Sequence, residues 1–431
     1  MPTEIFANRR ARALREMGER AVLVVPSAPT AIRNNDVEHD YRQDSDFFYL
    51  TGLDEPGSVL VLSTAHPEHR FVLFVRPRDP ERETWDGPRT GVDGAKERFG
   101  ADASFEIKEL GAKLPDYLQD AERLYYLFGR DRAFDDQVFT ALEATRRKAR
   151  LRKGVPQTTI EPGVLLHEHR LRKDAGELEI MRRASRITGE AHHAAMMLAR
   201  PGRHEHEVEA ELLRVFRRSG AERPAYGPIV GSGPNATILH HRKNDRHMQE
   251  GDLLLIDAGV ELEYYASDVT RTFPISGRFS APQRAIYDTV LRAQHACIEA
   301  VAPGATVDAI HQIALRVLTE GLIALGLVEG PLDDAVAKER YKPFYMHRTS
   351  HWLGMDVHDV GLYYLRGEGR AFEPGMVLTV EPGLYVSTSA EVDPKWRGIG
   401  VRIEDDVLVT EGGHENLTAH IPKDPDELER I

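Results

Sequence analysis

Residues 251–274 read GDLLLIDAGVELEYYASDVTRTFP, and this stretch decides how the chain is interpreted. Leu253–Ile256 is an apolar run of strand length, and Tyr264–Tyr265 opens a second candidate strand. A turn around Leu262–Glu263 places Asp257 directly opposite Asp268, with both side chains on one face of a hairpin. Opposed residues of this kind have Cβ atoms about 4.5–5.5 Å apart, and like charges there repel. A cation between the two carboxylates removes that cost.

The same stretch has a second interpretation, in which both aspartates are solvated and flank an ordinary hairpin. The turn lacks the Asn-Gly or Asp-Gly signal that fixes the register of short hairpins. From this stretch alone the two interpretations carry equal weight.

Composition narrows the class of protein. A chain of 431 residues predicts two or three domains, and 41% apolar with 29% charged residues is typical of a globular protein. A net charge of −13 without a basic block argues against nucleic acid and anionic membranes as partners. The single Cys297 cannot form an intrachain disulfide, and the first residues lack the apolar core of a signal peptide. Since no run approaches bilayer length either, we expect a cytoplasmic protein.

The first 170 residues are predicted to form an α/β domain, because strand and helix patterns alternate along them. The predicted helices span 3–18, 94–99, 113–119 and 136–150, and the predicted strands 21–27, 58–62, 71–75 and 123–127. A loop rich in Gly, Pro and Thr follows at 154–163, and the domain boundary is placed after residue 170.

Residues 171–431 are predicted to form a second domain. Helix patterns cover 174–198, 205–219, 281–301 and 306–325, and strands are predicted at 376–386 and 400–410. The order helix, helix, strand pair occurs twice, which suggests a duplicated half.

Three histidine-rich segments invite a metal interpretation, namely HEHR (167–170), HH (192–193) and HEHE (204–207). We reject it, because we expect them among solvated charges on helix surfaces or linkers and their spacing is not HExxH. The GSG at 231–233 lacks the residues of a phosphate loop and is interpreted as a turn that delivers His240 and His241. Cys297 is interpreted as a core filler.

Several residues that are unconvincing one by one point to a common site. Glu381 lies in a strand that stops at Pro382–Gly383. In RIEDD, Glu404 and Ile403 point to opposite faces of a strand. Burying a carboxylate such as that of Glu404 costs free energy unless the carboxylate is paired or bound to a metal. His347, His351 and His358 occur in MHRTSHWLGMDVHDVG (346–361), which indicates an irregular loop and strand rather than a helix. For each residue alone, a satisfied core histidine or an exposed glutamate is the favoured explanation.

Taken together, these motifs resemble the pita-bread metallopeptidases and, among them, the proline-specific aminopeptidases (aminopeptidase P, or Xaa-Pro aminopeptidases). The resemblance covers nearly the whole chain. Its motifs are RQDSDFFYLTG (42–52), IDAG (256–259), SDVTRTFP (267–274), SHWLGMDVHDVG (350–361), VEPGLY (380–385) and RIEDD (402–406). It implies an α/β non-catalytic domain at 1–170 and an α+β pita-bread catalytic domain at 171–431.

The resemblance implies two divalent metal ions in each subunit. The residues that match the family's ligands are Asp257, Asp268, His351, Glu381 and Glu404. Those matching Asp268 and Glu404 bridge the ions, Asp257 holds one ion, and His351 with Glu381 holds the other. Four carboxylates and one imidazole form an oxygen-rich set that suits Mn²⁺, with Zn²⁺ or Co²⁺ as alternatives.

The implied reaction is release of the N-terminal residue from peptides with proline in the second position, by attack of a metal-bridging hydroxide. Glu381 is the candidate proton shuttle, and His358 the candidate donor to the oxyanion. The resemblance also assigns catalytic or substrate contacts to His240, His347, His358, Arg402 and Tyr385. It further implies a homodimer or homotetramer in which Trp85 reaches a neighbour's site.

One position departs from the family, because Arg348 stands where glycine usually follows the histidine matching His347. A bulky cation there narrows the pocket or favours acidic substrates. The nearest alternative function is a prolidase, which cleaves only Xaa-Pro dipeptides with the same five ligands. A non-enzymatic pita-bread module that binds peptides is the third candidate, although such modules lose ligands and this sequence retains all five.

Overall fold

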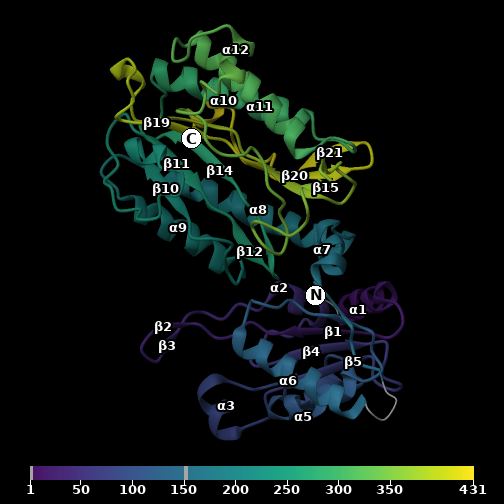
Figure 1. The fold of residues 1–431 in the computed structure, drawn as a ribbon. Coiled ribbons are helices and arrows are strands. Elements are labelled where there is room, and N and C mark those ends of the chain that lie inside the picture. Colours follow the sequence, from purple (N-terminus) through teal and green to yellow (C-terminus); the bar gives the residue numbers. More distant parts are fainter. Residues whose placement is uncertain (1–2, 150–153) are drawn as a thin grey trace. The chain divides into compact units, whose positions relative to one another are not determined.

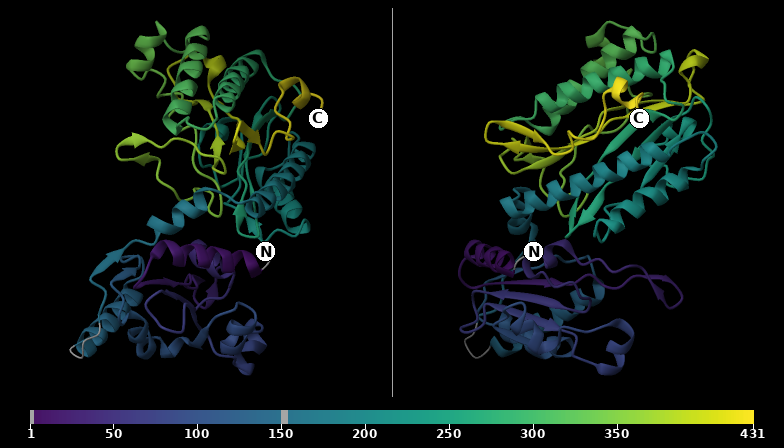
Figure 2. Two further views of the ribbon diagram at one scale, coloured as in Figure 1. Left: turned by 90° about the vertical axis from the view of Figure 1, so that its right-hand side faces the viewer. Right: turned by 180° about the vertical axis from the view of Figure 1, so that it is seen from behind.

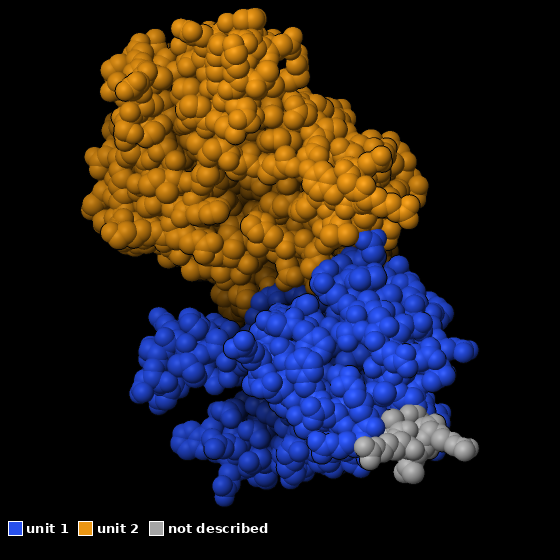
Figure 3. Space-filling view, in the orientation of Figure 1, with its two compact units in different colours: residues 1–169 blue, residues 170–431 orange. Residues whose placement is uncertain are grey.

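The computed structural model describes residues 3–149 and 154–431 and divides the chain into two compact units, residues 1–169 and 170–431 (Figures 1 and 3). The division falls one residue before the boundary expected from the sequence. Each unit has its own sheets and its own buried core.

The first unit is built on a six-stranded mixed sheet with the order β6-β5-β4-β1-β7-β8. β1 pairs antiparallel with β4 and parallel with β7, and β5 pairs parallel with β6. The strands are β1 (Ala21–Pro26), β4 (Val59–Ser63), β5 (Phe71–Val75), β6 (Ala103–Glu106), β7 (Arg123–Tyr125) and β8 (Thr158–Ile160). The helices are α1 (Thr3–Met17), α2 (Ser45–Thr51), α3 (Pro80–Asp86), α4 (Gly91–Glu97), α5 (Leu110–Leu118) and α6 (Arg132–Ala149).

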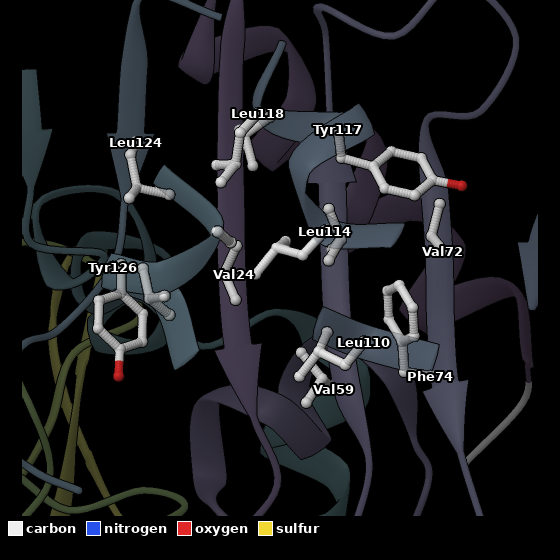
Figure 4. Packing of buried hydrophobic residues seen from close by; sticks show 14 of the residues in the cluster. Val24, Val59, Val72, Phe74, Leu110, Leu114, Tyr117, Leu118, Leu124 and Tyr126 are labelled. Carbon is white, nitrogen blue, oxygen red and sulfur yellow. The ribbon is translucent and has the colours of Figure 1, made fainter. Parts of the chain in front are cut away.

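Helices cover both faces of this sheet, which explains why its central strands are continuous apolar runs. On one face, Leu114 and Leu118 of α5 pack over Val24 and Val72 (Figure 4). On the other face, the Arg10 guanidinium of α1 lies 3.9 Å from the centre of the Phe71 ring. The α/β prediction for this unit is therefore confirmed.

Two expectations for the first unit need correction. The predicted loop at 154–163 contains β8, which pairs parallel with β7 at the sheet edge. Its three residues are exposed or half-buried, so no apolar run marks them. The predicted helix over 136–150 is α6, whose expected last residue, Arg150, lies outside the described residues.

The second unit contains two helix pairs, and an antiparallel strand pair follows each of them (Figures 1 and 2). The first set is α8 (Ala175–Leu198), α9 (Glu205–Arg218), β11 (Leu253–Asp257) and β14 (Thr270–Pro274). The second set is α10 (Ala281–Glu299), α11 (Val307–Ala324), β17 (Val377–Val380) and β20 (Asp405–Thr410). The predicted order helix, helix, strand pair is thus confirmed in both halves.

Shorter elements complete the second unit. They are α7 (Gly163–Leu171, which begins in the first unit), β9 (Arg223–Pro224), β10 (Ile229–Ser232), β12 (Val260–Leu262), β13 (Tyr265–Ala266), α12 (Leu332–Ala337), β15 (Tyr364–Leu365), β16 (Glu368–Gly369), β18 (Gly383–Val386), β19 (Ile399–Arg402), β21 (Gly413–Asn416) and α13 (Pro425–Leu428). The exposed hairpin of β2 (Ile32–Asn34) and β3 (Val37–Glu38) belongs to the first unit. Cys297 is fully buried in the core beneath β17 and β20, as expected of a core filler.

No helix among residues 3–149 and 154–431 has the length and apolar character needed to cross a membrane.

Candidate active site

The first strand pair of the second unit brings Asp257 and Asp268 to one buried place. Asp257 is the last residue of β11, and Asp268 lies two residues before β14 begins. Between these two aspartates, the backbone segments of Gly259 and Ser267 lie so close together that a Cβ built on Gly259 is 1.7 Å from the Ser267 carbonyl oxygen. Only glycine fits this approach, which explains the glycine of the IDAG motif.

The predicted register of this hairpin is wrong by two residues. Asp257 pairs with Thr270, and the turn is formed by Glu263 and Tyr264, with φ angles of 48° and 72°. Glutamate and tyrosine are not typical of left-handed turns, so the turn was predicted one position too early. Because side chains alternate with a period of two, the shift leaves Asp257 and Asp268 on the same face.

The second strand pair is broken where its two glutamates lie. β17 ends at Val380 and β18 begins at Gly383, while β19 ends at Arg402 and β20 begins at Asp405. The predicted strands 376–386 and 400–410 are therefore each two strands. At the first break Pro382 has no N–H for the ladder. Glu381 and Glu404 occupy these breaks, and Glu404 is almost fully buried.

His351 joins the carboxylates from the irregular segment that the sequence predicted. Its Nδ1 lies 3.1 Å from the Trp352 carbonyl oxygen, which leaves Nε2 directed at the acidic groups. Nε2 lies 3.3 Å from Asp268 Oδ2 and 3.6 Å from Glu381 Oε1. Ligand atoms of Asp268, His351 and Glu404 all lie within 4.8 Å of one another.

Burial and the neighbouring charges shift the pKa values of these groups. It raises the pKa of Asp268 despite the hydrogen bond with His351, and it raises the pKa of Glu381 to about 7. Burial, with the charge of Asp268, raises the pKa of Glu404 well above its usual range. Burial alone lowers the pKa of His351, but Asp268 and Glu381 raise it to about 9. Buried, mutually repelling carboxylates with an imidazole form a set that divalent cations fit.

Asp257 is held by two residues that do not ligate metals. Arg402 Nη2 donates to Asp257 Oδ2 at 2.6 Å, and Arg402 Nη1 donates to the Tyr385 hydroxyl at 3.0 Å. The Tyr226 hydroxyl donates to Asp257 Oδ1 at 2.5 Å and also reaches Oδ1 of Asp268. Burial and these carboxylates raise the pKa of Tyr226 well above its usual range, so it remains a donor.

The carboxylates lie at the inner end of a cavity of about 500 Å³. Its lining includes all the candidate metal ligands and the candidate substrate residues of the second unit except Tyr385, which contacts the lining residues His347 and Arg402. The lining residues are Tyr226, Ile229, Leu239, His240, Arg242, Asp257, Asp268, Val307, His347, Arg348, Ser350, His351, Val357, His358, Tyr363, Tyr364, Glu381, Arg402 and Glu404.

The three further histidines differ in their surroundings. His347 Nε2 lies 2.9 Å from the Tyr385 hydroxyl, and burial, with the charge of Arg402, lowers the pKa of His347 to about 4. The His358 ring stands at 82° to that of His351, with ring centres 4.5 Å apart, and burial lowers the pKa of His358. His240 is exposed at the cavity wall.

Trp85 belongs to the first unit, where it is 86% exposed on α3. Its role toward a neighbouring subunit stays a prediction.

The sequence gives no sign of Tyr226, because a lone tyrosine before a short strand matches no metal-site pattern. The expectation that the histidine-rich segments lie among solvated charges is wrong for all three, and in the HEHR segment His169 and Arg170 are buried. His192 is fully buried with Nε2 3.0 Å from the Ala258 carbonyl oxygen, next to Asp257, and burial lowers the pKa of His192 to about 4. Glu205, in the HEHE segment, is also fully buried.

Hydrogen bonds to Glu205 hold in place the segment that contains His240. Glu205 accepts hydrogen bonds from the backbone N–H of Ser232 at 2.7 Å and of Arg246 at 3.0 Å. It also accepts from Asn235 Nδ2 at 3.0 Å, and its Oε2 lies 3.0 Å from His241 Nε2. The loop predicted to deliver His240 is therefore anchored on both sides of that residue.

Comparison with known proteins agrees with this geometry. Residues 179–411 match the metallopeptidase family M24, and residues 6–126 match the aminopeptidase P N-terminal domain. The chain is 43% identical to the Xaa-Pro aminopeptidase of Escherichia coli, over 99% of this chain and 97% of that protein. It is 35% identical to human Xaa-Pro aminopeptidase 3, over 96% and 82%. The structure of aminopeptidase PepP from Pseudomonas aeruginosa superposes with a TM-score of 0.98 at 49% identity, covering 100% of this chain and 98% of that one.

Proposed function

Because this chain belongs to the metallopeptidase family M24, we infer that it is a metal-dependent aminopeptidase that releases the first residue of peptides with proline in the second position. Its fold is an α/β domain followed by an α+β pita-bread domain, as predicted. The observation that carries the inference is the convergence of Asp257, Asp268, His351, Glu381 and Glu404 at the inner end of one cavity.

We propose that these five residues hold two divalent cations, for which Mn²⁺ is the best match to four carboxylates and one imidazole. Two dications balance the four carboxylate charges. When bound, the cations activate water for attack and polarise the scissile carbonyl. Ligand atoms of Asp268, His351 and Glu404 lie within 4.8 Å of one another, which supports the proposal that these three residues would hold a cation together.

The remaining steps belong to side chains of the cavity. Glu381 lies between His351 and His347, with Oε2 3.8 Å from His347 Nδ1, where it can accept a proton and pass it to the leaving proline nitrogen. His358, perpendicular to His351, is placed to donate to the oxyanion. His240 and the His347–Tyr385 pair line the substrate's path.

Arg402 holds the Asp257 carboxylate in place, since it donates to that carboxylate, to Thr270 and to Tyr385 at once. The free α-amine of a substrate is attracted to the acidic inner end, which accounts for cleavage at the first peptide bond. Proline as second residue is compatible, because nothing in this scheme requires an N–H on the leaving group.

The experiment compares Ala-Pro-Ala with Ala-Pro in protein loaded with Mn²⁺, before and after treatment with a chelator. We expect cleavage of the tripeptide, loss of activity with chelator and recovery with Mn²⁺. Activity confined to Ala-Pro assigns the chain to the prolidases. Turnover indifferent to chelator overturns the metal mechanism.

We also propose a cytoplasmic homo-oligomer. The isolated Cys297 suits a reducing compartment, and the exposed indole of Trp85 suits a surface that a second copy covers.

A further inference from the structure

The active-site cavity is lined by groups of both charges. Its four carboxylates are buried or half-buried, whereas Arg242 and Arg348, which come from separate segments of the chain, are exposed at its wall. A cavity of about 500 Å³ accommodates a ligand of a few residues. A short peptide has the matching polarity, with its ammonium group at one end and its carboxylate at the other.

Arg242 is an exposed cation that has no hydrogen-bonding or ionic partner among residues 3–149 and 154–431. It follows the anchored His240–His241 segment and lies over Gly227, where a Cβ built on that glycine is 3.6 Å from Arg242 Nη1. Gly227 is next to Tyr226 of the cavity wall. Among the described residues none forms a hydrogen bond or ion pair with Arg242, so its guanidinium is available to a ligand.

Arg348 is held in place through one of its nitrogens only. Its Nη2 donates to Asp308 Oδ1 at 2.7 Å and to the Tyr364 hydroxyl at 3.1 Å, and that hydroxyl donates to Asp308 Oδ2 at 2.7 Å. No described residue accepts from Nη1 or Nε, and the side chain is 55% exposed. A guanidinium fixed on one side presents its remaining donors in a planar fork that matches a carboxylate.

Arg402, the third arginine of the cavity, is not available in this way. Its Nη2, Nη1 and Nε donate to Asp257, Tyr385 and Thr270 respectively, and the side chain is buried. A carboxylate that binds Arg402 has to displace these hydrogen-bonding partners, whereas a carboxylate that binds Arg242 and Arg348 displaces no described partner.

We propose that Arg242 and Arg348 bind a carboxylate of the substrate that lies beyond the proline. This inference rests on the proposed function and names its substrate class. The enzyme favours short peptides with a free C-terminal carboxylate, or longer peptides with an acidic residue after the proline. Both sources offer the same chemical group to the two arginines.

Two matched substrate pairs distinguish the sources. The first pair is Ala-Pro-Ala and its C-terminal amide, and the second is Ala-Pro-Glu-Ala amide and Ala-Pro-Gln-Ala amide. In Mn²⁺-loaded protein we expect a kcat/KM about tenfold higher for the charged member of at least one pair, the size of a charge-assisted hydrogen bond. The ratio shrinks as salt is added, because exposed charges are screened.

The double variant Arg242→Gln/Arg348→Gln brings the ratio to about one, since amides cannot form the ion pair. Arg316→Gln is the matched control, because Arg316 is an exposed arginine of α11 that pairs with Asp333 outside the cavity. Equal kcat/KM within both pairs in the wild type overturns the inference, and so does a double variant that retains the wild-type ratio.

A binding measurement separates this inference from the proposed function. Pro-Ala has no Xaa-Pro bond and corresponds to the product of Ala-Pro-Ala, and a structure of E. coli aminopeptidase P contains the inhibitor Pro-Leu. Calorimetry on the Mn²⁺-loaded protein is expected to show about tenfold tighter binding of Pro-Ala than of Pro-Ala amide. Equal dissociation constants overturn the carboxylate site even if Ala-Pro-Ala is cleaved. Discrimination without any cleavage of Ala-Pro-Ala supports the site and overturns the peptidase assignment.

Discussion

Glu381 lies opposite Glu404 at the break of one continuous antiparallel register. On one side of the break Val380 pairs with Asp405, and on the other Gly383 pairs with Arg402. The Ile403 N–H donates to the Pro382 carbonyl oxygen at 3.3 Å, so the chains stay together where the ladder is interrupted. Two carboxylates are thereby fixed face to face by the backbone itself, an arrangement that is unfavourable unless cations lie beside it.

Asp268→Asn and Glu404→Gln are expected to abolish peptidase activity while leaving the protein folded. Burial already opposes the charge of both groups, so removing it does not lower the melting temperature of metal-free protein. Activity on Ala-Pro-Ala and thermal unfolding are the two measurements, with the exposed Asp333→Asn as control. Either variant retaining wild-type turnover contradicts the ligand assignment.

Tyr226→Phe is expected to weaken metal binding about 10- to 100-fold, the usual effect of losing a partner that orients metal ligands. The hydroxyl that contacts both Asp257 and Asp268 is removed, while the ring remains. Titration of metal-free protein with Mn²⁺ measures the change. Tyr287→Phe, which alters a buried tyrosine bonded to the Lys423 carbonyl instead, serves as control. Equal Mn²⁺ affinity in the two variants is the contrary result.

His358→Ala is expected to reduce kcat about 100-fold, the size of one oxyanion donor, with a smaller change in KM. The ring lies beside His351 and lines the cavity. Steady-state kinetics on Ala-Pro-Ala separates the two constants. A rise in KM at unchanged kcat assigns His358 to substrate binding instead.

Glu205→Gln is expected to lower kcat/KM about tenfold and the free energy of unfolding by about 1–3 kcal/mol, because the amide nitrogen faces N–H groups that need an acceptor. The effect on activity arises from the loosened loop of His240. Glu211→Gln, which alters a partly buried carboxylate paired with Arg214 on the same helix, is the control. A loss of stability without any change in kcat or KM leaves Glu205 with a purely structural role.

Asp359→Asn is expected to cost about 3–5 kcal/mol of stability at pH 7, since it leaves the buried ammonium group of Lys173 without its carboxylate and removes one of the carboxylates that pair with Arg170, while Asp356 remains. Burial opposes ionisation of Asp359, but Lys173 and Arg170 lower its pKa below the usual range. The stabilisation is therefore complete above the unfolded pKa of about 3.9 and is lost as the pH falls through the lower folded pKa.

Urea unfolding between pH 7 and pH 3 tests this assignment. The variant is expected to show a shallower dependence on pH than the wild type. Asp288→Asn, which removes one half-exposed i,i+4 pair, is expected to cost less than about 1 kcal/mol. Equal losses in the two variants contradict the role assigned to Asp359.

Much of this architecture is predictable, because the spacing of apolar residues in long helices and strands indicates which of their faces are buried. The helices α8 to α11 and the apolar strands β1, β5 and β11 bury continuous stripes, and the sequence shows them directly. The metal ligands were found through motifs whose residues lie far apart in the chain. Neither periodicity nor spacing brings His351 to Asp268; only the resemblance to a family suggested that they meet.

The rest depends on backbone details with weak signals. The turn at Glu263–Tyr264 is formed by two residues with left-handed backbone angles that are neither glycine nor asparagine, so the predicted register was wrong by two residues. The stop at Pro382–Gly383 was expected from the proline, whereas the strand break at Ile403–Glu404 looks continuous in sequence because apolar residues surround it. Tyr226 and Glu205 act through single hydrogen-bonding atoms, for which composition and periodicity carry no information.

The placement of the ligand carboxylates has a consequence for how such a protein can change over time. They are fixed by strand ends and ladder breaks inside the sheet, whereas the exposed lining residues Arg242 and Arg348 belong to connecting segments and Tyr364 to the short hairpin of β15 and β16. Substitutions that alter the preferred peptide can therefore accumulate in these segments without disturbing the reactive centre. An engineer seeking a new specificity is best advised to diversify those connecting segments and leave the four acidic positions alone.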